Sequence, residues 1–110
     1  MTAREVADRL NFRILAGHGE KTITGFYACD LLSWVISHAG SGNLWVTVMN
    51  NLNVLAVATL ADVACIVIPE GIEVDGEVLA RANAQNITVL SANQTGAEVI
   101  VAVSGLIKSV

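Results

Sequence analysis

The stretch NLWVTVMNNLNVLAVATLADVACIVI, residues 43–68, decides the fold. It begins with an apolar, β-branched run over 44–48, which is too uniformly apolar for an edge strand and predicts a central, parallel one. A polar loop with Asn50, Asn51 and Asn53 follows, and an alanine-rich segment then leads into a second apolar run. The order strand, loop, helix, strand predicts a parallel α/β unit.

The asparagine loop is the first candidate for a small-molecule site. In a parallel sheet, the loop that leaves the carboxyl end of a strand meets the unpaired N–H groups and the positive end of the next helix. Asn50 or Asn51 also suits the N-cap of that helix, and helix capping is the leading interpretation of this loop.

Helix and strand signals also alternate before the central stretch. Thr2 and Glu5 form a capping box that opens a helix over about 3–10, and a strand over 12–16 follows. The next strand is expected over residues 22 to 29.

Gly25 lies within that strand, and Asp30 lies directly after it. Gly25 is expected to mark a bulge or a close backbone approach. Asp30 is most simply the N-cap of the following helix, and the alternative is a carboxylate that faces a ligand at the strand-to-helix junction. The apolar face expected for this helix consists of Leu31, Leu32, Val35, Ile36 and Ala39.

After the central stretch, the alternation of helix and strand continues to the end of the chain. Asp75 is expected to cap a helix that runs to about residue 85, and 86–90 returns as a strand. Thr95 and Glu98 form a second capping box. The core face expected for the last helix consists of Ala97, Ile100, Val103 and Ile107.

These elements predict a single α/β domain over residues 1–110, with a mostly parallel sheet and helices on both faces. Apolar residues make up 54% of the chain and charged residues 15%, an apolar excess that favours a homo-oligomer. The amino terminus lacks a signal-peptide pattern and no apolar run is long enough to span a bilayer, so a cytoplasmic location is expected.

The charge pattern argues against nucleic acid and against anionic membranes as partners. The net charge is −4, and the basic residues are scattered rather than clustered. They are Arg4, Arg9, Arg13, Lys21, Arg81 and Lys108.

The sequence carries no catalytic or metal-binding signature. It has no GxxxxGK[ST], GxGxxG, GxSxG or CxxC motif. Cys29 and Cys65 are isolated and are expected to be buried free thiols, with a disulfide or a metal site as the lesser alternative. His18 is expected to be exposed in a glycine turn, and His38 to lie at a helix end. No catalytic residue, metal or cofactor is therefore assigned.

The two tryptophans are candidates for a dimer interface. Trp34 lies at the border of an apolar helical face, where core packing and a dimer contact are equally supported. Trp45 lies in the predicted central strand, where a core position with a partner for its indole N–H is expected. An interface or a pocket lining is the alternative for Trp45.

The order of these features resembles the DRTGG domain family over nearly the whole chain, in particular its small stand-alone bacterial and archaeal members. The resemblance rests on Gly25, Tyr27, Asp30-Leu31-Leu32-Ser33, Gly42, Leu44, Trp45, Thr47 and the run from Asn53 to Leu60. It implies an α/β fold similar to the amino-terminal domain of HPr kinase. In the family, the domain occurs beside CBS domains in regulatory pyrophosphatases, in front of some phosphotransacetylases and with nucleotide-binding synthase-like domains, which implies a regulatory, dimerising role near an adenine-nucleotide site.

The sequence departs from the family pattern at both motifs that give the family its name. The Gly-Asp-Arg positions after the central strand read Asn50, Asn51 and Leu52, and the Thr-Gly-Gly positions read Pro69, Glu70 and Gly71. Without the arginine, no guanidinium is available there for bidentate phosphate binding. The ligand-binding residues that the loops and the resemblance together suggest are Asp30, Thr47, Asn50, Asn51, Asn53 and Gly71.

The expected function is that of a non-enzymatic regulatory or interaction module. It would act as a homodimer and sense an adenine nucleotide or another small ligand, or bind a partner protein. The alternative is a divergent phosphotransfer or hydrolytic enzyme, or a subunit of one, that uses the same strand-end loops.

Overall fold

The chain folds around a five-stranded sheet with the strand order β1-β5-β4-β3-β2 in a computed structural model that describes residues 1–107. Only the pair β1 and β5 is antiparallel, and every other neighbouring pair is parallel. This arrangement confirms the predicted mostly parallel sheet. Lys108 lies outside the described residues. The strands are β1 (Arg13–Ala16), β2 (Gly25–Ala28), β3 (Asn43–Val46), β4 (Cys65–Ile68) and β5 (Val89–Ser91).

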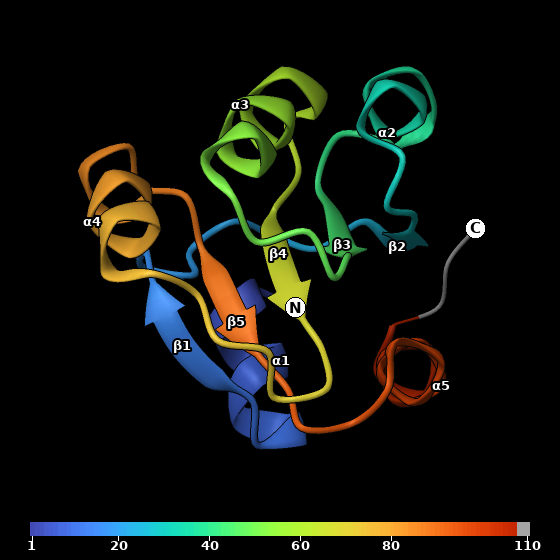
Figure 1. Cartoon of the computed structure of the whole chain (residues 1–110). Coiled ribbons are helices and arrows are strands. Elements are labelled where there is room, and N and C mark those ends of the chain that lie inside the picture. The colour runs from blue at the N-terminus through green and yellow to red at the C-terminus, as the bar shows by residue number, and fades with distance from the viewer. Residues whose placement is uncertain (108–110) are drawn as a thin grey trace.

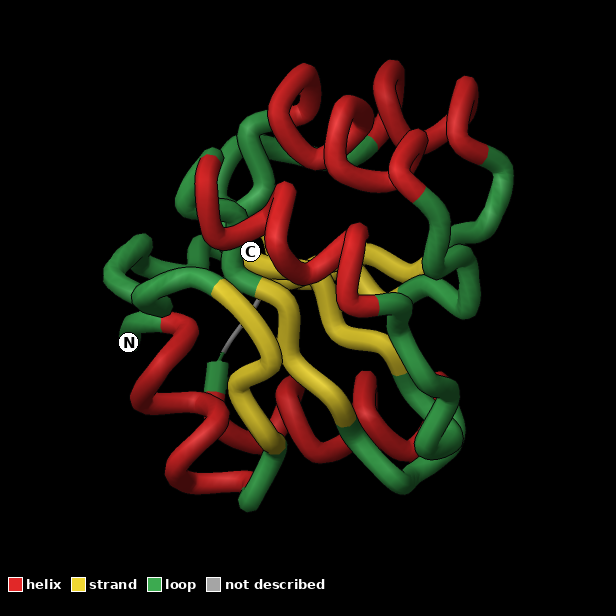
Figure 2. The backbone as a smooth tube through the Cα atoms, turned by 60° about the vertical axis from the view of Figure 1, so that its left-hand side comes forward, coloured by secondary structure: helices red, strands yellow, loops and turns green. Residues whose placement is uncertain are grey.

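Helices cover both faces of the sheet, as predicted (Figure 1). Three of them, α2, α3 and α4, connect β2 to β3, β3 to β4 and β4 to β5 over one face, whereas α1 and α5 pack on the other. Figure 2 shows the strands enclosed between these two layers of helices. The helices are α1 (Ala3–Leu10), α2 (Leu32–His38), α3 (Leu52–Ala61), α4 (Gly76–Ala84) and α5 (Gly96–Leu106).

The helix starts follow the capping signals in the sequence. Both capping boxes form, Thr2 with Glu5 and Thr95 with Glu98. Asn51 is the N-cap of α3, and its side-chain oxygen accepts a hydrogen bond from the Asn53 N–H at 3.0 Å.

Trp45 belongs to the core of the molecule. It is fully buried in β3, and its indole N–H donates to the Cys29 carbonyl at 2.9 Å. A buried tryptophan needs such a partner for its one donor. The expected core position is confirmed, and the alternative of a dimer interface at Trp45 is wrong.

The helix after Asp30 buries less of its surface than predicted. Val35 is the one residue of α2 with a fully buried side chain, whereas Leu31 and Ile36, expected in the core, are 62% and 44% exposed. The physical reason is that α2 lies over the edge strand β2. In its layer of helices, α2 therefore has a neighbour on one side, α3. Ala97 was also expected in the core and is exposed, because Val99 and Val103 supply the buried face of α5.

The predicted bulge at Gly25 is absent from β2, where Gly25 pairs in register with Asn43. Before Gly25, the backbone turns toward the amino terminus at Ile23, while Thr24 still bonds to the residue that precedes β3. The Ile23 N–H donates to the Met1 carbonyl, and the Thr24 N–H donates to the Gly42 carbonyl.

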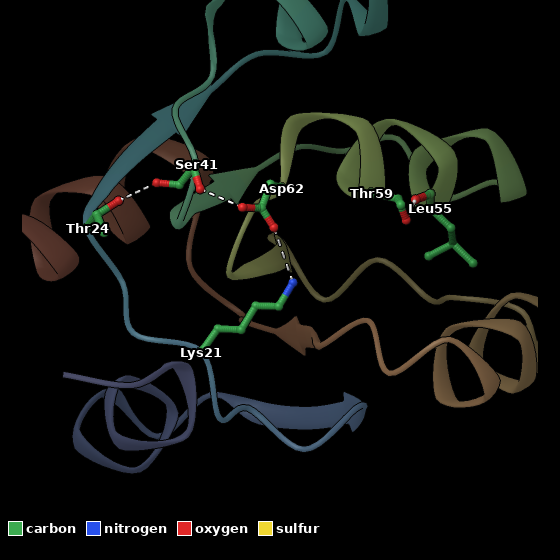
Figure 3. Close-up of polar contacts among 6 residues, drawn as sticks. All are labelled: Lys21, Thr24, Ser41, Leu55, Thr59 and Asp62. Carbon is green, nitrogen blue, oxygen red and sulfur yellow. Dashed lines mark hydrogen bonds and ion pairs between the residues drawn. The ribbon is translucent and has the colours of Figure 1, made fainter.

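A polar cluster closes the amino-terminal edge of the sheet (Figure 3). Asp62 accepts a hydrogen bond from the Ser41 hydroxyl at 2.5 Å and lies 3.6 Å from the Lys21 ammonium group. The Thr24 hydroxyl donates to the Ser41 carbonyl at 2.7 Å. The hydrogen bond from Ser41, followed by the charge of Lys21, lowers the pKa of the Asp62 carboxyl.

Candidate functional site

Ligands of open α/β sheets bind outside the carboxyl ends of the strands. In this protein, β2, β3, β4 and β5 end at one edge, where the antiparallel β1 begins. We call this the carboxyl edge. Three depressions open along it, and each contains some of the residues that the sequence suggested.

The first depression, the α5 pocket, has a volume of about 250 Å³ and lies between the ends of β2 and β3 and the start of α5. Asp30 and Thr47 meet here. The Thr47 hydroxyl donates to Asp30 Oδ1 at 2.7 Å, and the Val48 N–H donates to the same oxygen at 2.9 Å. Glu70 adds a second carboxylate to the lining, which contains no basic residue of the described chain.

Asp30 therefore does not cap α2. The N-cap position belongs to Leu31, which makes no side-chain capping bond. The Asp30 carboxylate instead reaches across to the end of the neighbouring strand, where a hydroxyl and a backbone N–H both satisfy it. The predicted cap is wrong, because two charge-assisted hydrogen bonds to the next strand outweigh one to the helix start.

The second depression, the α3–α4 pocket, has a volume of about 380 Å³ and contains the asparagine loop. Asn51 caps α3, and the Asn50 amide donates to the Glu73 carbonyl at 2.8 Å. Two of the three amides thus hold the fold together. Asp75 and Glu77 also line this pocket, and within residues 1–107 no basic side chain does. Asp75 occupies the predicted N-cap position of α4 but makes no side-chain capping bond.

The third depression is the largest of the three, with a volume of about 490 Å³. We call it the β1–β5 pocket, because it opens between the start of β1 and the end of β5. The loop after β4 supplies Gly71 and Glu73, the loop after β5 supplies Asn93, and β1 supplies Arg13. Of the described residues that line the three pockets, Arg13 is the one with a positive charge.

The six suggested ligand residues therefore do not form one site. Asp30 and Thr47 meet in the α5 pocket, the three asparagines lie in the α3–α4 pocket, and Gly71 lies in the β1–β5 pocket. Arg13 and Glu73 were not suggested at all. Nothing in the sequence placed Arg13 near residues 71–74, because the antiparallel pairing of β1 with β5 has no local signal.

The exposed surface of α2 is a second feature of functional interest. Trp34 is 50% exposed, and its ring stacks on the His38 ring with centroids 3.8 Å apart and an angle of 10° between the planes. His38 Nδ1 lies 3.0 Å from the Trp34 carbonyl and 2.8 Å from the Ser37 hydroxyl. These contacts hold both rings in place on the surface.

The cysteines do not form a reactive pair. Neither takes part in a disulfide in the described part of the chain. Burial raises the pKa of the Cys65 thiol to about 12, whereas Cys29 is half-buried after β2.

Two further kinds of site have no counterpart in the described structure. Over residues 1–107, no three side chains of His, Cys, Asp or Glu gather closely enough to hold a metal ion. None of the helices in this range has both the length and the apolar character needed to cross a membrane.

The fold and its carboxyl edge define a small α/β module with a mostly parallel sheet and several shallow sites at the strand ends. The model of the DRTGG domain matches residues 5–106, and the chain belongs to this family. The resemblance drawn from the sequence is thereby confirmed. A comparison with curated proteins finds no match.

Among solved structures, the chain is similar to the CBS and DRTGG domains of the regulatory region of Clostridium perfringens pyrophosphatase, crystallised with the activator diadenosine tetraphosphate. The TM-score is 0.66 at 14% sequence identity, with 91% of this chain covered. The match covers 46% of the other chain, so this protein spans less than half the length of that regulatory region.

Proposed function

We propose that the protein is a non-enzymatic regulatory module that forms a homodimer through α2 and responds to an adenine nucleotide or a related small ligand. The observation that carries the proposal is the apolar surface of α2. Leu31 at the N-cap and Trp34 three residues later are both exposed at the start of α2, and Ile36 is exposed on a different side of this short helix. Exposed aromatic and aliphatic side chains that gather on one element are typical of protein interfaces.

The Trp34 and His38 stack supports a contact at this surface. Binding normally costs conformational entropy, because side chains at an interface must be ordered. Here the tryptophan ring is already held against the histidine ring, so less of that cost remains. A twofold contact would place the same helix of both copies at the interface.

The regulatory region of the pyrophosphatase supports the nucleotide part of the proposal. Part of that region shares the fold, and the region was crystallised with diadenosine tetraphosphate as its activator. A ligand that binds the native state raises its unfolding temperature by mass action. Thermal unfolding with AMP, ADP, ATP and diadenosine tetraphosphate, each with and without Mg²⁺, therefore tests the response directly.

The fate of the nucleotide decides between a module and an enzyme. We expect at least one nucleotide to raise the unfolding temperature and to be recovered intact by chromatography. Turnover of that nucleotide would overturn the proposal in favour of the phosphotransfer or hydrolytic alternative. If every nucleotide leaves the unfolding temperature unchanged, the sensing part of the proposal is wrong.

Sedimentation tests the dimer. The expected mass at micromolar concentration is close to twice the chain mass of 11.5 kDa. Trp34→Glu should shift the mass to that of one chain, because it places a charge in the apolar contact. Val101→Glu is the matched control, since Val101 is an exposed apolar residue on α5, away from α2. A wild-type mass of one chain would contradict the dimer.

A further inference from the structure

The β1–β5 pocket lies where the connections of the sheet change sides. The loop after β4 leads to α4 on one face, and the loop after β5 leads to α5 on the opposite face. Two adjacent strands whose loops diverge in this way leave a crevice between them, and small ligands of open α/β sheets bind in such crevices. We propose that this pocket is the ligand site and that it takes a phosphate monoester of about the size of a nucleoside monophosphate. The proposal rests on the ligand-responsive function proposed above.

The base of the crevice is fixed by backbone hydrogen bonds. The Glu70 N–H donates to the Gln94 carbonyl at 2.8 Å, and the Gly71 N–H donates to the Ala92 carbonyl at 2.9 Å. Gly71 has a φ of 65°, and a Cβ at this position would lie 3.5 Å from the side-chain oxygen of Asn93. The loop after β4 is therefore held against the loop after β5 as far as Gly71, and residues 72–74 form a side of the crevice beyond these bonds.

Charge distinguishes this pocket from the other two. The α5 pocket and the α3–α4 pocket each carry two carboxylates and, among the described residues, no cation. Arg13 gives the β1–β5 pocket a guanidinium group, which no described carboxylate engages in an ion pair. A guanidinium with free donors suits a phosphate group, which it binds with two parallel hydrogen bonds.

The same charges limit how many phosphates the pocket can take. Glu73 lies in the lining with Arg13, and the whole chain carries a net charge of −4. One arginine offsets part of the charge of one phosphate group, whereas the further charges of a triphosphate would meet the Glu73 carboxylate and an acidic protein. The pocket should therefore prefer a monophosphate to a polyphosphate.

The rest of the lining suits a ligand that has a sugar and an apolar group. A carboxylate such as Glu73 accepts hydrogen bonds from the hydroxyl groups of a ribose, as acidic residues do in other nucleotide sites. Leu15, Ile72 and Leu79 provide an apolar wall, and Asn93 offers an amide beside it. A volume of about 490 Å³ falls within the range of small-molecule pockets, roughly 300–1,000 Å³.

Calorimetric titration with AMP, ribose 5-phosphate, adenosine and ATP tests the proposal. We expect AMP and ribose 5-phosphate to bind, and adenosine and ATP to bind more weakly than AMP. Arg13→Gln should weaken AMP binding at least about tenfold, because it removes a charge-assisted contact to the phosphate. Arg9→Gln is the matched control, since it removes the same charge from an exposed position of α1 outside the pocket and should leave AMP binding unchanged.

A second variant tests the selectivity. Glu73→Gln should narrow the ratio of AMP to ATP affinity, because it removes the charge that repels the additional phosphates. The unfolding temperature of each variant without ligand shows that it folds.

Three outcomes would overturn the assignment of this pocket. Equal nucleotide binding by wild type and Arg13→Gln would leave the proposed function standing and place the ligand elsewhere. Tighter binding of ATP than of AMP would contradict the monophosphate preference. If neither AMP nor ribose 5-phosphate binds, the assignment of a phosphate monoester to this pocket is wrong. The sedimentation of Trp34→Glu would still test the dimer.

Discussion

The hydroxyl of Thr47 donates to the Asp30 carboxylate at 2.7 Å and so joins the ends of two parallel strands. Thr47 is buried and also accepts a hydrogen bond from the Met49 N–H at 3.2 Å. Thr47→Val keeps the shape but removes both interactions. We expect a loss of about 1–3 kcal/mol in the free energy of unfolding, measured by urea denaturation.

Thr59→Val is the control for this prediction. The Thr59 hydroxyl donates to the Leu55 carbonyl one helical turn earlier, at 3.0 Å (Figure 3). That carbonyl already belongs to the backbone ladder of α3, so the loss should stay within about 0.5 kcal/mol. Equal losses for the two variants would show that the contact of Thr47 with Asp30 contributes nothing specific.

Two glycine substitutions should change stability in opposite directions. Gly17 has a φ of 79°, and a Cβ there would lie 2.6 Å from Thr88 Cα, so Gly17→Ala should cost more than about 2 kcal/mol. Gly105 lies in α5, where an added Cβ would point into open space among the described residues, so Gly105→Ala should stabilise the protein by about 0.5 kcal/mol. Thermal unfolding measures both, and a stabilising Gly17→Ala would contradict the close approach.

Asp62 should make stability depend on acidic pH. Its pKa is lowered below the ordinary value of 3.8, so the folded state releases the proton more readily than the unfolded state. The resulting stabilisation is fully present above 3.8 and disappears as the pH falls through the lowered folded pKa. Wild type should therefore exceed Asp62→Asn in urea midpoint at neutral pH, and the difference should shrink as the pH falls below 3.8.

Asparagine suits this test because Asp62 has a φ of 55°, a left-handed conformation that asparagine also adopts readily. Asp8→Asn on the exposed side of α1 is the control, and it should retain the wild-type change in midpoint across the same pH range. A constant difference between wild type and Asp62→Asn at all pH values would contradict the role of the Asp62 charge.

The Cys65 thiol should be unreactive in the native protein. Cys65 is fully buried in β4, and burial raises its pKa to about 12, so its reactive thiolate is nearly absent at neutral pH. With Cys29→Ser, titration with a thiol reagent should show no rapid labelling in the native state and one thiol after unfolding. Rapid labelling of the native variant would mean that β4 opens without global unfolding.

The elements of the fold could be predicted because their signals are local. Periodic apolar residues and capping side chains, such as Thr95 with Glu98, lie within a few positions of each other and mark where a helix starts. The asparagine loop was also placed correctly between a strand and a helix. These signals do not depend on the rest of the chain.

The site could be predicted only in part, because it depends on contacts between distant segments. The position of Asp30 before a helix suggested an N-cap. Its hydrogen-bond partners, Thr47 and Val48, lie instead at the end of the neighbouring strand. Similarly, the spacing on α2 predicted a buried face, but the helix lies at an edge of the sheet and leaves Leu31 exposed. Arg13 reaches the β1–β5 pocket through a strand pairing that no local pattern encodes.

The antiparallel pairing of β1 has a consequence for the order of folding. The parallel strands from β2 to β5 each pair with the next strand in the chain, whereas Arg13 must find Ser91, at nearly the opposite end. Closing so long a loop costs more entropy than joining sequence neighbours. We therefore expect α1 and β1 to dock last. Because Arg13 completes the β1–β5 pocket, that pocket is assembled only when folding is complete.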